Sequence, residues 1–484
     1  MSLIKKNYIY NLLMNFSSLL IPLVTFPYVT RVLGPESIGK VNFANSIVEF
    51  FTLFFHFGIY PYGVRELSKV RDNQVLFNKR FSELVIINTF LVFSLLILFV
   101  ITVELFDKFK SERLLFYVVG LNIIIFTLGF DWLFISRENY SYVSIRMIIT
   151  RLIGVVLLLL LVTKEQDYIL YAFLGLFIGG LVSYLINPFF YRRYASLYLS
   201  DIDLLQHIKP LVLTLIVSFL TRAYLNLDVT TLGFLSNYES VGFYVVGLKI
   251  VLLFQSLVLS FSSVIAPRIA YYSESMNKEE IRNFVRKSIE FAWFLSAPIL
   301  FGILILSREV VVVVSGMDFI SSVPVLIIIS GIFITTPILS VLSQYLYYTG
   351  GEKKYIKFVV TPTIIISLIL YAILIPSYNY IGAAIARIIS EIVHFWLYVI
   401  STKEVGLKNI FSVRSLKYLG IGLIMFVVLL LFGKLVIIDS ALIKIITYTT
   451  IGGVIYFGVN LITRDYFAME VIKFAHSLIF RRSL

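Results

Sequence analysis

Long apolar segments recur from one end of this 484-residue chain to the other, and they leave few folds open to it. Hydrophobic residues make up 59% of the sequence and charged residues only 14%. A water-soluble domain of this size has no core large enough to bury so much apolar surface. Runs of about 18 or more apolar residues have the length that crosses a bilayer as an α-helix. The sequence therefore predicts an all-α, polytopic membrane protein.

We predict about fourteen transmembrane helices, and the connections between them are too short to hold a soluble domain. A count of twelve is the alternative. The first seven predicted spans are 8–29, 38–60, 81–103, 114–134, 142–162, 168–190 and 208–235. The other seven are 241–265, 284–306, 323–348, 355–375, 381–400, 418–435 and 442–461.

Lys and Arg are distributed unevenly over the alternating loops between these spans. With the N-terminus placed inside, the inside segments hold 29 basic residues and the outside loops hold 9. Cytoplasmic loops of membrane proteins carry an excess of Lys and Arg. We therefore expect both termini in the cytoplasm. The same bias accounts for the net charge of +13, so no nucleic-acid partner is expected.

Two short stretches of the chain, 203 positions apart, match each other. ESIG begins at Glu36 and opens the second span, and ESVG begins at Glu239 and opens the eighth. At the same offset, Arg65 matches Arg268 at the cytoplasmic ends of these two spans. Six spans separate the copies, so both run through the membrane in the same direction. The match predicts parallel repeats related by an axis along the membrane normal.

The repeat predicts how the chain divides into parts. We expect two pseudo-symmetric six-helix lobes, formed by residues 1–200 and 201–405, around a central cavity. Residues 406–484 would add two further transmembrane helices and a cytoplasmic tail. A substrate site is expected between the lobes, and Arg65 and Arg268 are expected near its cytoplasmic gate.

Ionisable residues lie inside the seventh and eighth predicted spans. Arg222 and Asp228 are in the seventh, and Lys249 is in the eighth. An ionisable group near the bilayer centre costs about 2.5–3.5 kcal/mol on insertion scales, so it faces protein or a water-filled cavity. A guanidinium and an ammonium both suit phosphate oxygens. We predict that Arg222 and Lys249 line an aqueous path for an anionic substrate; a structural role is the alternative.

Carboxyl groups within the spans are candidates for coupling transport to H⁺ or Na⁺. They are Glu49, Asp228 and Glu391. Glu49 lies near the middle of the second span, where a structural ion pair with Arg222 or Lys249 is the alternative. His56, in the same span, is predicted to be a packing residue.

The twelfth span carries three polar side chains on one face. Arg387, Glu391 and His394 lie at positions i, i+4 and i+7. Arg387 is a further candidate for substrate binding. A local ion pair between Arg387 and Glu391 is the alternative, since residues four apart on a helix are neighbours.

Signatures of catalysis are missing from the sequence. It contains no HExxH motif, no Walker A motif and no GxSxG in a suitable context. With no cysteine, it has neither disulfides nor thiolate metal sites. We expect a protein that is not an enzyme, with no catalytic residue, no metal site and no cofactor beyond a coupling ion.

Several stretches resemble the Wzx polysaccharide flippases of the multidrug/oligosaccharidyl-lipid/polysaccharide exporter superfamily. The most specific are FPYVTRVLGPESIGKVNFANSIVEFF and FGIYPYGVRELSKVRDN, both in the first 75 residues or so. Others are FDWLFISRENYSYVSIRMIITRLIG, HIKPLVLTL and SVIAPRIAYYSES. The resemblance covers roughly residues 1–400.

The resemblance implies a function and a set of partners. It implies that undecaprenyl-pyrophosphate-linked oligosaccharide repeat units, for O antigen or capsule, cross the bacterial cytoplasmic (inner) membrane by alternating access. It implies Arg31 as a substrate-binding residue beside Arg222, Lys249 and Arg387. Membrane lipids and a polysaccharide polymerase are the other partners, and we expect a monomer.

Two other functions remain open at this point. A cation-coupled drug or metabolite antiporter of the same superfamily would need an acidic binding lobe, whereas the basic residues within the spans favour an anion. A membrane glycosyltransferase or polymerase would need a large extracytoplasmic loop with catalytic residues. The outside loops of this chain are short.

Overall fold

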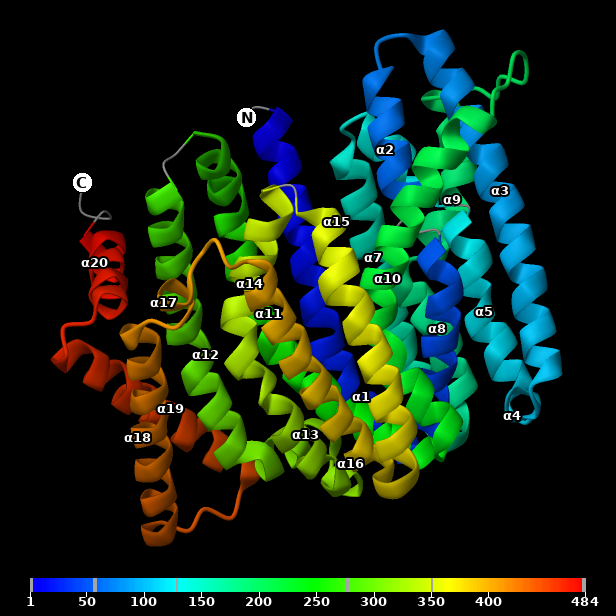
Figure 1. Cartoon of the computed structure of the whole chain (residues 1–484). Coiled ribbons are helices and arrows are strands. Elements are labelled where there is room, and N and C mark those ends of the chain that lie inside the picture. The colour runs from blue at the N-terminus through cyan, green and yellow to red at the C-terminus, as the bar shows by residue number, and fades with distance from the viewer. Residues whose placement is uncertain (1–2, 55–58, 128, 276–277, 350, 481–484) are drawn as a thin grey trace. The chain divides into compact units, whose positions relative to one another are not determined.

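The computed structural model describes residues 3–54, 59–127, 129–275, 278–349 and 351–480, and in these ranges the chain forms helices and no strand (Figure 1). The prediction of an all-α protein is confirmed. The helices gather into two compact units, Met1–Val245 and Val246–Leu484. The predicted lobes, 1–200 and 201–405, stay a prediction.

Unit 1 is built from ten helices in its described part and the first turns of an eleventh. These are α1 (Leu3–Phe54), α2 (Tyr60–Lys69), α3 (Gln74–Leu105), α4 (Asp107–Lys110), α5 (Arg113–Thr127), α6 (Asp131–Ser136), α7 (Tyr140–Leu161), α8 (Tyr168–Gly179), α9 (Leu181–Phe190), α10 (Leu205–Leu235) and the start of α11 (Tyr238–Ser275). Helix α10 belongs to this unit because it packs against α1.

Unit 2 holds the rest of α11 and the helices that follow. These are α12 (Lys278–Ser315), α13 (Val323–Ser330), α14 (Ile332–Tyr348), α15 (Glu352–Tyr355), α16 (Thr361–Ser401), α17 (Leu407–Ile410), α18 (Val413–Leu435), α19 (Ala441–Ile462) and α20 (Tyr466–Phe480). A π-helical turn, Ile356–Val360, leads into α16. Helix α12 is the centre of the unit, since α13, α14, α18 and α19 all pack against it.

Two of the helices each cover most of two predicted spans. Helix α1 breaks at Gly34, whose φ of 70° is a conformation that a residue with a side chain adopts only under strain. Pro35 follows and starts the second half. Helix α16 breaks at Asn379, where φ is 49°. The chain therefore crosses from one span to the next at these points through a single irregular residue rather than a loop.

The structure has about fourteen membrane-spanning segments, as predicted. Within the described ranges, seven helices are individually long and apolar enough to cross a bilayer, or eight when α13 and α14, bent by 46°, are taken as one span. The remaining predicted spans correspond to the halves of α1, the second half of α16, and α5, α8–α9 and α10. In the described residues, each predicted span is thus largely helical.

Helices α18 and α19 contact α12 through ion pairs as well as through apolar packing. Arg414 of α18 lies 3.0 Å from Glu290 of α12. Lys444 of α19 lies 2.6 Å from Glu309 at the other end of α12. Between these pairs, the hydroxyl of the buried Tyr456 donates a hydrogen bond of 3.0 Å to the carbonyl of Phe294. These contacts position α18 and α19 along α12.

Candidate functional site

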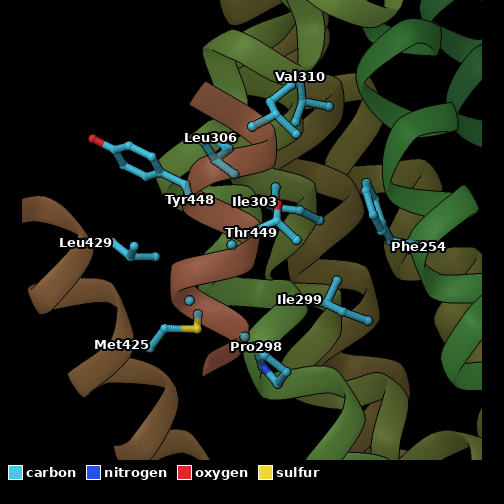
Figure 2. A pocket seen from close by; sticks show the side chains of 14 residues that line it. Phe254, Pro298, Ile299, Ile303, Leu306, Val310, Met425, Leu429, Tyr448 and Thr449 are labelled. Atoms are coloured by element: carbon cyan, nitrogen blue, oxygen red, sulfur yellow. The ribbon is translucent and has the colours of Figure 1, made fainter. Parts of the chain in front are cut away.

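An apolar groove runs between α12, α18 and α19 in unit 2, with Phe254 of α11 closing one side (Figure 2). It encloses about 250 Å³. Its lining residues are apolar except for Tyr448 and Thr449. Pro298, Ile299, Gly302, Ile303, Leu306 and Val310 come from α12, Met425 and Leu429 from α18, and Ile445, Tyr448, Thr449, Gly452 and Gly453 from α19.

Glycine creates the space in this groove. A Cβ placed on Gly302 or on Gly453 would meet no atom within 4 Å, so both backbones border open volume. Gly452 has the opposite role, because a Cβ there would touch Leu429 and Met425. It lets α19 approach α18 closely. The groove therefore has one tightly packed wall and two open positions.

A cation lies at one end of the groove. The ammonium of Lys444 is 5.5 Å from the centre of the Tyr448 ring, and it also pairs with Glu309. A charged pair is stable where water or headgroups reach it, and costly within hydrocarbon. The apolar lining thus ends beside this ion pair. Such a site suits an extended hydrocarbon chain.

The predicted basic residues lie on four helices. Arg387 of α16 is buried, with 6% of its surface exposed, and Lys249 of α11 is half-buried. Arg31 is exposed on α1, three residues before the break at Gly34. Arg222 is part of α10, but its side chain lies outside the described residues. Their assignment to substrate stays a prediction.

The three candidate coupling carboxyl groups have different surroundings. Asp228 is fully buried in α10, and the hydroxyl of Tyr244 in α11 donates a hydrogen bond of 2.7 Å to it. Glu49 is exposed in α1, and Glu391 is half-buried in α16. His56 lies outside the described residues.

Arg65 and Arg268, the predicted gate residues, are both exposed at the chain positions that the repeat relates. The guanidinium of Arg65 lies 5.3 Å from the centre of the Tyr62 ring and 3.4 Å from Glu66. Arg65 is therefore oriented by its own helix, α2. The described residues contain no group of three His, Cys, Asp or Glu that could hold a metal ion.

Comparison with protein families identifies the family to which the chain belongs. The model of the family described as "Polysaccharide biosynthesis protein" matches residues 4–273, which is more than half of the chain. The chain belongs to this polysaccharide biosynthesis family. The resemblance to Wzx flippases of the exporter superfamily is thereby confirmed, and so is a multi-pass membrane protein of the transporter type.

Individual relatives of this protein also support its place in this family. It is 24% identical over 400 residues to a putative O-antigen transporter of Escherichia coli (strain K12), covering 80% of this chain and 94% of that protein. It is 27% identical over 164 residues to the probable low-salt glycan biosynthesis flippase Agl15 of Haloferax volcanii, covering 34% of each. The relative from Escherichia coli extends through most of unit 2.

Solved structures show the same fold. The lipid II flippase MurJ, in an inward closed conformation, matches with a TM-score of 0.75 at 17% identity, covering 96% of this chain and 100% of that one. An inward-facing multidrug resistance transporter of the MATE family matches with a TM-score of 0.64 at 13% identity, covering 79% of this chain and 95% of that one.

A buried polar cluster in unit 1 of this family member escaped the sequence analysis. Asp131 of α6, Arg146 of α7 and Asn187 of α9 bond to one another. Each has less than a tenth of its surface exposed. The Tyr142 ring lies 5.0 Å from the Arg146 guanidinium. Arg146 stands within the predicted span 142–162, so the rule that ionisable residues in spans need partners would have singled it out.

A second unpredicted cluster attaches the segment before α10 to α3. The carboxylate of Glu83, fully buried, accepts a hydrogen bond of 2.9 Å from the backbone of Asp203. Its other oxygen lies 2.8 Å from His207, whose second ring nitrogen lies 2.8 Å from the hydroxyl of Tyr62. Glu83 also stands within a predicted span, 81–103, which was the available signal. The cluster fixes where α10 starts.

Proposed function

We propose that this family member flips oligosaccharide repeat units, linked to undecaprenyl pyrophosphate, from the cytoplasmic to the periplasmic leaflet of the bacterial inner membrane. The observation that carries the proposal is the apolar groove of unit 2. A flippase for a lipid-linked glycan has to hold a hydrocarbon tail as well as a polar head, and this groove has the lining for the tail. The names of the transporter and flippase relatives support the same cargo.

The polar head needs a different environment. A diphosphate carrying a glycan does not cross hydrocarbon unaided, because its charges and hydroxyls would lose their hydration. In the proposal, Arg222, Lys249, Arg387 and Arg31 replace that water around the diphosphate.

Transport follows from alternating access in this proposal. The two predicted lobes, 1–200 and 201–405, rock so that the site opens to one side of the membrane at a time. Arg65 and Arg268 lie at the cytoplasmic gate. Binding of H⁺ or Na⁺ at Glu49, Asp228 or Glu391 drives the return of the empty protein. The protein works as a monomer, with both termini in the cytoplasm, and delivers its product to a polysaccharide polymerase.

Filling the groove tests the proposal. In Gly453→Leu, the new side chain enters the open volume of the groove without meeting the backbone of another helix. Each buried CH₂ of a tail contributes about 0.8 kcal/mol, so losing two or three of them weakens tail binding by roughly tenfold or more. We expect surface polysaccharide to fall by that factor, with precursor accumulating in the membrane of a strain that depends on this chain.

The same helix offers a matched control. Gly458 of α19 also has open space at its Cβ position but does not line the groove. Gly458→Leu should leave polysaccharide output unchanged at equal protein abundance. Normal output from Gly453→Leu, with normal abundance, would remove the groove from the transport path and with it the main support for a lipid-linked cargo.

A further inference from the structure

Helix α20 begins at a well-defined turn that follows directly on α19. Arg464 lies just beyond α19 with a φ of 49°, a left-handed conformation that is uncommon for a residue with a side chain. The carboxylate of Asp465, which is buried, accepts hydrogen bonds of 3.0 Å from the backbone of Phe467 and from the hydroxyl of Tyr418 in α18. Lys417 of α18 lies 3.1 Å from the same carboxylate. These contacts fix where α20 leaves the rest of unit 2.

The first turn of α20 packs against unit 2 through one face of the helix. Ala468 is fully buried, and the ring centre of Phe467 lies 5.1 Å from that of Phe291 in α12. One turn farther along the helix, Val471 and Ile472 are exposed over 43% and 42% of their surface. Residues three and four apart lie on the same side of a helix. The apolar face that contacts the protein at Phe467 and Ala468 therefore continues beyond the protein.

The sequence carries this pattern to the end of α20. Apolar residues recur at helical spacing on one side of the helix, and they are Phe467, Ala468, Val471, Ile472, Phe474, Ala475, Leu478 and Ile479. The other side holds Glu470, Lys473, His476 and Ser477, with Met469 and Phe480 among them. At 15 residues, α20 is too short to cross a bilayer. A helix with one apolar and one charged face lies in the plane of a membrane surface.

Basic residues outnumber acidic ones in and around this helix. Arg464 is exposed, and so is Lys473, over 69% of its side chain. Arg481 and Arg482 follow α20 in the sequence. The segment 464–482 holds four basic and two acidic residues. Anionic phospholipid headgroups carry the opposite charge, and they lie directly above the hydrocarbon that an apolar face can enter.

We propose that α20 is an interfacial anchor, whose apolar face enters the membrane beside α19 while the basic residues around it bind anionic phospholipid headgroups. Helix α19 is long and apolar enough to cross the bilayer, so the turn at Asp465 places the start of α20 at the membrane surface. With the predicted orientation, this is the cytoplasmic leaflet. The contact of Phe467 with Phe291 joins the anchor to α12, the central helix of unit 2. The inference rests on the membrane location and is independent of the cargo.

Fluorescence quenching tests where α20 lies, and the chain has no cysteine of its own to interfere. Val471→Cys and Lys473→Cys place a thiol on opposite sides of the helix, about 160° apart. Each full-length variant is labelled with bimane and reconstituted into vesicles of phosphatidylcholine and phosphatidylglycerol. Bromine atoms on the acyl chains should quench the probe of Val471→Cys about threefold more than that of Lys473→Cys, and aqueous iodide should give the reverse order.

A third site calibrates the measurement. Leu423 is an exposed residue of the membrane-spanning helix α18, so bimane on Leu423→Cys gives the quenching of a probe in hydrocarbon. Equal quenching by iodide at Val471→Cys and Lys473→Cys would mean that α20 stands in water. Protection of Val471→Cys from both quenchers would mean that protein, such as a second copy of the chain, covers the apolar face. Either result would overturn the anchor.

The binding of anionic headgroups has a test of its own, with Val471→Cys as the labelled parent. Phosphatidylglycerol, added to phosphatidylcholine vesicles, should raise the ratio of acyl-chain to iodide quenching by about fivefold for each basic residue at the surface. Arg464→Gln/Lys473→Gln should lose most of this increase. Lys434→Gln, in the last turn of α18, should keep it. The same increase in the double variant as in the parent would overturn the headgroup assignment.

Discussion

Lys249→Ala is expected to lower the export of surface polysaccharide by about tenfold to a hundredfold, at unchanged protein abundance. Hydrogen bonds to charged groups contribute about 1.5–3 kcal/mol, and 1.4 kcal/mol corresponds to a factor of ten in binding. If Lys249 holds a phosphate oxygen, its loss weakens the diphosphate complex by that amount. Arg222→Ala should have an effect of the same size, and the measurement is surface polysaccharide in a strain that depends on this chain.

Charge-conserving and distant substitutions make this result specific. Lys249→Arg keeps a cation at the position and should retain most of the export. Lys434→Ala removes an exposed lysine of α18 and should have no effect. Full export by both Lys249→Ala and Arg222→Ala would contradict the assignment of these residues to the substrate.

Arg146→Ala is expected to be the most destabilising of the single substitutions in unit 1. It leaves the carboxyl of Asp131 buried without its guanidinium partner. Removing one member of a buried ion pair costs about 3–5 kcal/mol, because the remaining charge is uncompensated. The measurement is the midpoint of thermal unfolding in detergent, together with the amount of protein in the membrane.

A double substitution identifies the cause. In Asp131→Asn/Arg146→Met no charge is left buried, so the protein should recover much of the lost stability. Arg151→Ala is the comparison on the same helix, since Arg151 bonds to hydroxyl and carbonyl groups of α1 rather than to a carboxylate. Unfolding of Arg146→Ala at the parental temperature would show that the cluster contributes nothing to stability.

The spans of this protein could be predicted because each depends on a local property. A run such as 81–103 or 442–461 is long and apolar, and hydrocarbon forces its backbone into a helix that satisfies its own hydrogen bonds. The helix breaks at Gly34 and Asn379 could not be predicted, since a short interval between two spans does not reveal whether the helix axis continues through it. The position of the spans was correct, and the form of the connection was not specified.

The partners of the ionisable residues could not be predicted in the same way. The sequence analysis treated Asp228 as a coupling candidate, and in the structure Tyr244, on the next helix, donates a hydrogen bond to it. It did not single out Arg146, and in the structure Arg146 is buried against Asp131. Uniformly apolar helices carry little periodicity, so the sequence does not show which face of one meets which face of another.

What the sequence alone determined is that this protein belongs in a membrane and consists of apolar helices, while its two related halves stay a prediction. Each of these follows from residues close together in the chain or from the comparison of two short stretches. Only the tertiary structure decided that Gly39 and Gly242 meet the backbones of each other's repeat, and that Gly302 and Gly453 open a groove against α18. Those features arise where helices distant in sequence pack together, and the volume left between two helices is a property of the pair.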